Sequence, residues 1–257
     1  MEKRCPLDTT RIFSYENGVE SYYFAAKENN FISPHVIVGG KGSFSPSNFL
    51  TGFDKFLQAF EISRYKKPLL FIAKERFVKS IVKFLNDKQL PFNARLNPCI
   101  EFVITKEQEK VVMELEVPNL SQGYELGTVN PKDADFIVSK WKYASEGEVE
   151  NTRQKITSNP SSAIYIQENL VGFEMVDTKG GLTHQYVLEQ HRGKGLGRAL
   201  EIDLAKKGIR DGQTVFKHVE MGNTPVVEAS LRSPFWTARR LENGDYDRMT
   251  WIYLSPM

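Results

Sequence analysis

The chain has 257 residues, enough for two modest domains or one large one, with apolar content sufficient for a real core. Its 34 Lys and Arg nearly balance its 32 Asp and Glu, and a net charge of +2 disfavours a nucleic-acid partner. Two cysteines, Cys5 and Cys99, are too few for a disulfide framework and suit a reducing compartment. No metal is expected, because the four histidines lack neighbouring ligands at metal-site spacing.

The apolar runs are too short to span a bilayer, so we expect no membrane association. The first eight residues lack the apolar core of a secretory signal, and Glu2 and Asp8 do not suit a mitochondrial leader. A soluble intracellular protein is therefore expected.

The first part of the chain, residues 1–118, is expected to form a small α/β domain. Helical apolar spacing covers residues 49–60 and 75–86, and strand-like runs are expected at residues 36–38, 69–72, 101–105 and 111–116. The stretch Gly39–Ser43 is similar to a phosphate-binding loop, but Phe44–Ser47 after it does not suggest an immediate helix start. We therefore expect a flexible loop there and no catalytic constellation in this part.

The polar stretch Val117–Gly123, broken by proline and glycine, is the expected boundary with a second domain, residues 119–257. No internal repeat is visible on either side. In the second domain Asn130 is expected to cap a helix that begins at Pro131 and continues through Trp141. A helix at 148–157, strands at 163–167, 170–176, 182–188 and 214–220, a helix from residue 224, and a closing hairpin of strands 235–240 and 249–254 complete the expected order.

The segment His191–Leu200 has glycines at positions 193, 195 and 197. It follows a strand-like run and includes the start of an expected helix, residues 194–210. Glycines at such a junction let backbone N–H groups surround a phosphate, and the helix dipole adds to the attraction. The spacing excludes a dinucleotide fingerprint, whose third glycine would fall on Arg198. A Walker loop is also excluded, because Gly195 follows Lys194 where that motif needs Ser or Thr.

The spacing R-x-x-G-x-G, from Arg192 to Gly197, resembles the acyl-CoA pyrophosphate loop of the GNAT acyltransferase superfamily. The order of expected elements from Tyr124 to Leu254 is also similar to that family. The resemblance implies an α+β fold with a mixed, splayed central sheet, preceded by the smaller α/β domain. It implies coenzyme A contacts from the backbone of the strand before the loop and from the loop itself: Tyr186, Val187, Leu188, Arg192, Gly193, Lys194, Gly195, Leu196 and Gly197. Arg198 is equally well explained as a solvated helix residue.

Within this superfamily, Phe216–Asn223 is similar to the glycine N-acyltransferase family, where a His-Val-acid run precedes an asparagine. Val138–Trp141 followed by Glu148, and the late Trp251, strengthen the likeness. This resemblance implies acyl-CoA-dependent amino-acid conjugation and a mitochondrial location, with the cytosol as the alternative.

The same resemblance implies that Asn223 binds the pantetheine arm, although an N-cap role explains it as well. Ser230 stands where many members have a proton-donating tyrosine, and a helix-surface serine is as good an explanation. The family's glutamate base would fall on Gly180–Gly181, so no carboxylate is present there. We expect His218 with Glu220 to act instead, followed by His184, while Glu174 and Glu189 are further candidates.

The expected reaction is direct attack of an amine on the thioester in a ternary complex, because neither cysteine has a local activating partner. A monomer without a metal is expected. Arg232, Arg239 and Arg240 would suit an amino-acid carboxylate, or are only surface charges. The alternatives are acetylation of a protein or polyamine amine, favoured by an acidic acceptor groove, and a non-catalytic acyl-CoA-binding module, suggested by Gly181.

Overall fold

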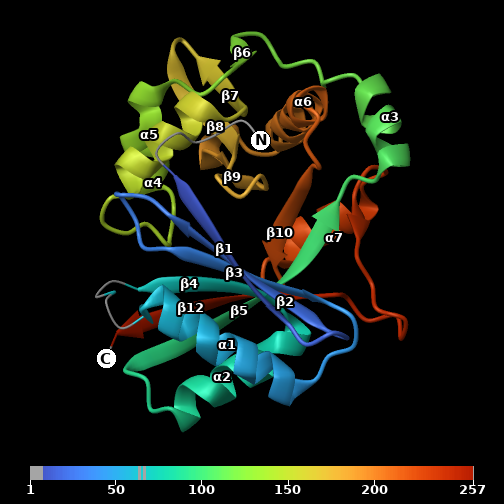
Figure 1. Ribbon diagram of the computed structural model, residues 1–257. Helices are drawn as coiled ribbons and strands as arrows, with labels where there is room; N and C mark the ends of the chain where they lie inside the picture. The colour runs from blue at the N-terminus through green and yellow to red at the C-terminus, as the bar shows by residue number, and fades with distance from the viewer. Residues whose placement is uncertain (1–7, 63–64, 66–67, 257) are drawn as a thin grey trace. The chain divides into compact units, whose positions relative to one another are not determined.

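The computed structural model describes residues 8–62, 65 and 68–256 (Figure 1). Cys5 and most of the segment tested for a leader lie outside these residues. The described chain divides into two compact units, neither of which is continuous in sequence. Unit 1 comprises Glu101–Val219 and Pro225–Ala238, and unit 2 comprises residues 8–100, Glu220–Thr224 and 239–256. The boundary expected at residues 117–123 therefore lies inside unit 1.

Unit 2 contains a mixed sheet with the strand order β1-β2-β3-β4-β12-β5. Its strands are β1 (Thr9–Glu16), β2 (Ser21–Glu28), β3 (His35–Lys41), β4 (Leu69–Lys74), β12 (Met249–Pro256) and the first part of β5 (Phe92–Val103). β3 and β4 are parallel, and β12 pairs antiparallel with both β4 and β5. The expected closing hairpin is wrong, because β12 pairs here while β11 (Thr237–Ala238) pairs with the end of β5.

Helices α1 (Pro46–Phe60) and α2 (Glu75–Asp87) pack side by side on one face of this sheet (Figure 1). The loop expected at residues 39–47 is shorter in the structure, because residues 39–41 belong to β3 and α1 starts at Pro46. Ser45 caps α1, and Pro46 occupies its first turn, where a missing N–H costs nothing. One face of α1 presents phenylalanines at helical spacing to the sheet. Their rings contact one another and the rings of two strands: Phe49, Phe53, Phe56, Phe60, Phe24 and Phe71. This aromatic cluster is the core of unit 2.

Unit 1 contains the strand order β5-β10-β9-β8-β7-β6, with β11 paired to β5. Besides the end of β5, its strands are β6 (Tyr124–Gly127), β7 (Ser161–Ile166), β8 (Asn169–Val176), β9 (Leu182–Val187) and β10 (Phe216–Glu220). Helices α4 (Ala134–Ser139), preceded by a 3-10 turn at Pro131–Asp133, and α5 (Glu148–Ser158) cover one face of the sheet, and α6 (Leu196–Arg210) covers the other (Figure 1). α7 (Thr224–Arg232) follows β10.

Residues 111–116 do not form the expected strand. They fall in and just after α3 (Lys106–Glu114), which starts with a capping box formed by Thr105 and Gln108. Each of these two side chains bonds the backbone N–H of the other, so the helix start is well determined. In the described residues no helix is both long and apolar enough to cross a membrane.

Two irregularities shape the sheet of unit 1. In the described chain, one register pair, Lys217 with Leu182, joins the parallel strands β9 and β10, so the two strands part beyond it. On its other side β9 pairs antiparallel with β8, but one β8 residue, Glu174, faces two β9 residues, His184 and Gln185. This is a β-bulge, which bends a strand and redirects its side chains. The expected mixed α+β fold with a splayed central sheet is confirmed.

Candidate functional site

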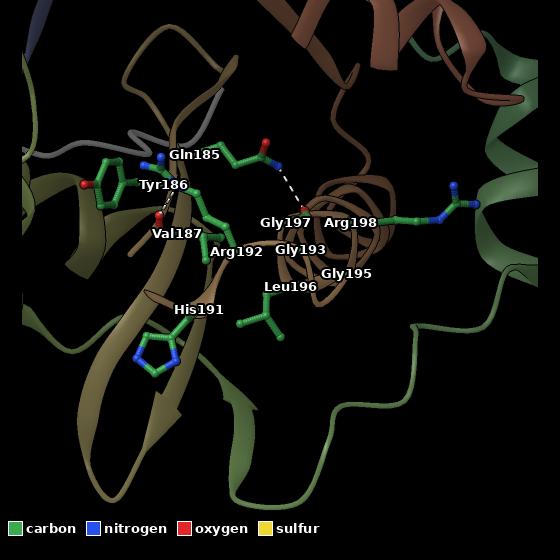
Figure 2. Close-up of a pocket in the computed structure, with 10 residues that line it drawn as sticks. All are labelled: Gln185, Tyr186, Val187, His191, Arg192, Gly193, Gly195, Leu196, Gly197 and Arg198. Carbon is green, nitrogen blue, oxygen red and sulfur yellow. Dashed lines mark hydrogen bonds between the residues drawn. The ribbon is translucent and has the colours of Figure 1, made fainter. Parts of the chain in front are cut away.

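A cavity of about 290 Å³ opens at the junction of β9 and α6 (Figure 2). It is lined by the end of the strand, the glycine turn and the first turn of the helix: Gln185, Tyr186, Val187, His191, Arg192, Gly193, Gly195, Leu196, Gly197 and Arg198. Seven of the ten residues expected to contact coenzyme A are therefore brought together. Lys194 and Leu188 adjoin this set in sequence but do not line the cavity.

The glycine turn leaves the N-terminus of α6 open. Gly193 and Gly195 have φ angles of 75° and 76°, a region that glycine adopts without strain. A Cβ at either position would meet nothing within 4 Å, so these glycines face open space. Gly195 is the N-cap of α6, and no side chain caps the helix. The first N–H groups of a helix lack intrahelical partners and carry partial positive charge, so this terminus suits an anion.

The basic residues of the turn are held by neighbours. Arg192 donates from Nε to the carbonyl oxygen of Val187 at 2.9 Å, and its guanidinium lies over the ring of Tyr186. Lys194 donates from Nζ to the hydroxyl of Tyr124 at 2.8 Å, and that hydroxyl is 2.8 Å from His191 Nδ1. Arg198 points away from the other labelled side chains (Figure 2), in agreement with a solvated residue.

Two of the β9 backbone groups expected to pair with a ligand have partners within the protein. The Leu188 N–H donates to the carbonyl of Val171, and the Val187 carbonyl accepts from Arg192. A carbonyl oxygen has a second lone pair, so Val187 keeps capacity for one further donor.

The bulge gives His184 a left-handed backbone, with φ at 59°, and turns its ring against Trp141 at a centroid distance of 4.4 Å. Its Nδ1 is 3.0 Å from the Thr183 hydroxyl, while its Nε2 is buried and has no hydrogen-bond partner. Burial, followed by the positive charge of Lys155, lowers the pKa of His184 well below its ordinary value. His184 is therefore a neutral imidazole with one free ring nitrogen at pH 7.

Charged side chains also meet on the α6 side of the sheet. Lys217 of β10 pairs with Glu201 of α6, and buried Glu174 of β8 accepts from Gln185 Nε2 at 3.2 Å. Burial, reinforced by the charge of Glu201, raises the pKa of Glu174 to about 8. Glu174 is thus largely protonated at pH 7, and its side chain lies on the α6 side of the sheet.

His218 has a partner that the sequence did not indicate. Its Nε2 lies 3.2 Å from Glu101 Oε2, and both side chains are about nine-tenths buried. Sequence reasoning missed Glu101, which lies 117 residues away and before the expected domain boundary. Where the family's glutamate was sought, a Cβ on Gly181 would lie 3.0 Å from the ring of Phe216, which fills that space.

The remaining expected residues are placed less favourably. Ser230 is buried and donates to the Val226 carbonyl of its own helix at 2.8 Å, so its proton is already engaged. Asn223 belongs to unit 2, where its N–H donates to Glu220 O at 2.8 Å. Arg232 pairs with Glu228. Glu189, a further candidate base, is exposed beside the turn. Of the two other arginines considered for a carboxylate, Arg239 and Arg240, the second donates to Gly244 O and Tyr246 Oη.

Comparisons with known proteins agree with this geometry. The model of the FR47-like protein family matches residues 167–229. A Drosophila protein solved by X-ray crystallography superposes with a TM-score of 0.75 at 15% identity, covering 92% of this chain and 80% of that one. A GCN5-related N-acetyltransferase from Kribbella flavida gives 0.55 at 12% identity, with 96% and 90% covered. A tandem GNAT protein from the clavulanic acid biosynthesis pathway gives 0.56 at 14% identity, with 98% and 84% covered.

No curated protein sequence matches the chain. The structural identities are low, so the likeness concerns the fold. The cavity residues lie within the segment that matches the FR47-like model. The described chain therefore has the fold of the GCN5-related N-acetyltransferases (GNAT), and the segment that forms its cavity is FR47-like.

Proposed function

We propose that this protein is an acyl-CoA-dependent N-acyltransferase that acylates the amine of a small molecule, glycine or another amino acid. One observation carries the proposal: the uncapped, glycine-rich N-terminus of α6 opens a cavity beside the point where β9 parts from β10. The GNAT fold supports it, and so does the likeness of Phe216–Asn223 to the glycine N-acyltransferases.

The residues present suit coenzyme A. The amides from Arg192 to Gly197 would hold the pyrophosphate, because Gly193 and Gly195 face open space and the helix terminus is positive. The pantetheine arm would follow β9 in the gap left by β10. An extended arm is about as long as four or five strand residues at about 3.3 Å each, so it reaches from Leu188 back to about His184. The thioester would then lie at the bulge.

In the proposed reaction the lone pair of a neutral amine forms a bond to the acyl carbon, and the carbon–sulfur bond breaks. The attacking nitrogen loses a proton, and the departing thiolate gains one. His184 is our first choice of base, because its Nε2 is partnerless, its ring is neutral and it lies at the bulge. His218, held by Glu101, is the second choice.

The charged side chains around His184 occur in pairs. Lys155 and Lys179 act on the His184 pKa as nearby cations and Asp177 acts in the opposite direction, while Glu148 and Asp177 pair with the two lysines. The choice of acceptor therefore rests on the likeness of Phe216–Asn223 to the glycine N-acyltransferases. An amino acid is therefore the acceptor we propose, with protein or polyamine amines as the alternatives.

Release of free coenzyme A from acetyl-CoA and benzoyl-CoA, measured with and without a pooled amino-acid panel, tests the proposal. Gly195→Glu places a charged side chain in the open cavity and should abolish both binding and release. Gly212→Glu is the matched control, because Gly212 has φ at 67°, also faces open space, and lies at the other end of α6.

Release that needs an amino acid, fails in Gly195→Glu and persists in Gly212→Glu supports the proposal. Binding of acyl-CoA without release, tested also with polyamines and peptide amines, favours the non-catalytic module suggested by the Phe216 ring at Gly181. Absence of acyl-CoA binding by the unaltered protein overturns the proposal.

A further inference from the structure

Gln185 joins two elements that border the cavity. Its Nε2 donates to the Gly197 carbonyl in the first turn of α6 at 3.1 Å and to the Glu174 carboxyl on β8 at 3.2 Å. Figure 2 shows the side chain reaching from β9 to the helix. An amide nitrogen has two hydrogens, so both bonds can exist together and occupy its full donor capacity.

The position of Gln185 depends on the bulge. Because His184 and Gln185 together face Glu174, the bulge directs His184 towards Trp141 and leaves Gln185 beside α6. Gln185 is exposed, so burial in a core does not account for its fixed orientation. Ordering an exposed glutamine costs rotamer entropy, which its two hydrogen bonds offset.

We propose that Gln185 is a positioning residue, which fixes the first turn of α6 against β8 so that the turn's amides face the pyrophosphate of the bound coenzyme. The inference rests on the proposed function. Gly197 is within the segment assigned to the pyrophosphate, and Gln185 holds its carbonyl from the side of the helix. Without this bond the turn keeps its glycines and the packing of Leu196 against the sheet, but it loses its hydrogen bond to β9.

The charged groups around Glu174 give the arrangement a dependence on pH. Glu201 on α6 and Lys217 on β10 act directly on Glu174, and Asp203 of α6 bonds Ser162, the β7 residue opposite Glu174. Burial raises the Glu174 pKa to about 8, so ionisation above that pH adds a negative charge close to the anion site. Affinity for an anionic ligand should therefore fall as pH rises through this range.

Calorimetric titration tests the inference with three probes: coenzyme A, 3′-phosphoadenosine 5′-diphosphate, which retains a diphosphate, and pantetheine, which has none. Gln185→Leu replaces the amide, which donates both hydrogen bonds, with an apolar side chain of similar size. Because two hydrogen bonds are lost, we expect coenzyme A and 3′-phosphoadenosine 5′-diphosphate to bind about tenfold more weakly. Pantetheine affinity should not change. Gln122→Leu, the same substitution at an exposed loop position, should leave all three affinities unchanged.

A conservative variant separates positioning from general stability. Glu174→Gln keeps an oxygen acceptor for Gln185 but cannot ionise, so it should retain affinity at pH 7 and lose the decline above pH 8. Equal or tighter coenzyme A binding by Gln185→Leu would overturn the inference, and tighter binding would show that Gln185 obstructs the cavity. Equal weakening of all three probes would also overturn it. If the unaltered protein binds no coenzyme A, the proposed function fails instead.

Discussion

The two units contain the same succession of elements, and the cavity described above belongs to unit 1. In unit 2 the antiparallel strands β1, β2 and β3 lead through a glycine turn into α1 and then the parallel strand β4. In unit 1 the strands β7, β8 and β9 lead in the same way into α6 and β10. Both helices have 15 residues. The chain thus contains a structural repeat that its sequence does not reveal.

The first difference is strand pairing. β3 and β4 remain paired from His35 with Leu70 to Val38 with Ala73, whereas β9 and β10 are joined through Lys217 and Leu182. Continuous pairing over these four residues satisfies the backbone groups of this part of β3 and leaves no gap for an extended ligand along it. A parallel strand pair therefore offers a slot only where the strands part.

The second difference is the glycine turn. In unit 2 the Glu20 carboxylate takes the place that an anion would need, since it accepts from Tyr22 Oη at 2.7 Å, Asn48 Nδ2 at 3.1 Å and Ser43 Oγ at 3.2 Å. These bonds, with that of Tyr22 first, lower the Glu20 pKa, so the group is charged at neutral pH. Ser45 also caps α1, whereas no side chain caps α6. The turn of unit 2 is therefore occupied by a carboxylate of the protein itself.

The largest effect should come from removing the proposed base of unit 1. His184→Gln should lower kcat by about 10²–10⁴-fold, the usual contribution of a general base, with little change in coenzyme A affinity. His35→Gln in β3 makes the same change in the other unit and should leave kcat intact.

The pH profile sharpens this test. Because burial lowers the His184 pKa, its imidazole is unprotonated at neutral pH, so activity should stay level through neutrality. It should fall only in acid, below the ordinary histidine value of 6.5. An unchanged kcat in His184→Gln would exclude it and direct attention to His218 and Glu101.

In unit 2 we expect a substitution effect of similar free energy to that of His184→Gln, but on stability and not on activity. Phe53 is fully buried and contacts the rings of Phe24, Phe49 and Phe71, so Phe53→Ala should lower the free energy of unfolding by about 3–5 kcal/mol. Urea denaturation measures this loss. Coenzyme A affinity of the folded fraction should not change, and a large loss of affinity would contradict a purely structural role for unit 2.

The smallest effects should come from alanine at the two glycine turns, and they should fall on different properties. A Cβ at Gly42 would lie 2.5 Å from the Val19 carbonyl oxygen, whereas one at Gly195 would enter the cavity, and both positions have positive φ. Each substitution should cost about 1–3 kcal/mol in backbone strain, with Gly42→Ala at the upper end because of the added clash. Only Gly195→Ala should also weaken coenzyme A binding.

Calorimetry of the unaltered protein should find one binding site per chain, and two would refute the contrast between the units.

Local patterns allowed the sequence to predict most of what surrounds the cavity. The glycine turn, the helix expected at residues 194–210 and the strands on either side depend on neighbouring residues, and the structure contains them, with the helix beginning at Leu196. The helix at residues 106–114 had a local signal as well, since Thr105 and Gln108 have capping-box spacing. The prediction of a strand at residues 111–116 followed the apolar residues of that stretch instead, and it is wrong.

Contacts between distant residues were not predictable in this way. No periodicity in a single sequence indicates that Glu101 lies beside His218, or that Glu20 occupies the turn before α1. The bulge at His184 was not predicted either, because its position depends on pairing with β8. The surroundings of the proposed catalytic residues thus depend on contacts between distant residues, which a local sequence pattern does not indicate.

The insertion of β12 between β4 and β5 has a consequence for how the protein is made. Ile252 and Leu254 of β12 are fully buried in the core of unit 2, although more than half of the chain separates them from β5. During synthesis the ribosome must release these residues before the sheet of unit 2 can close. Until then β4 and β5 each expose an unpaired edge, a state prone to aggregation. Nascent chains that stall before residue 249 should accordingly depend on chaperones that shield strand edges.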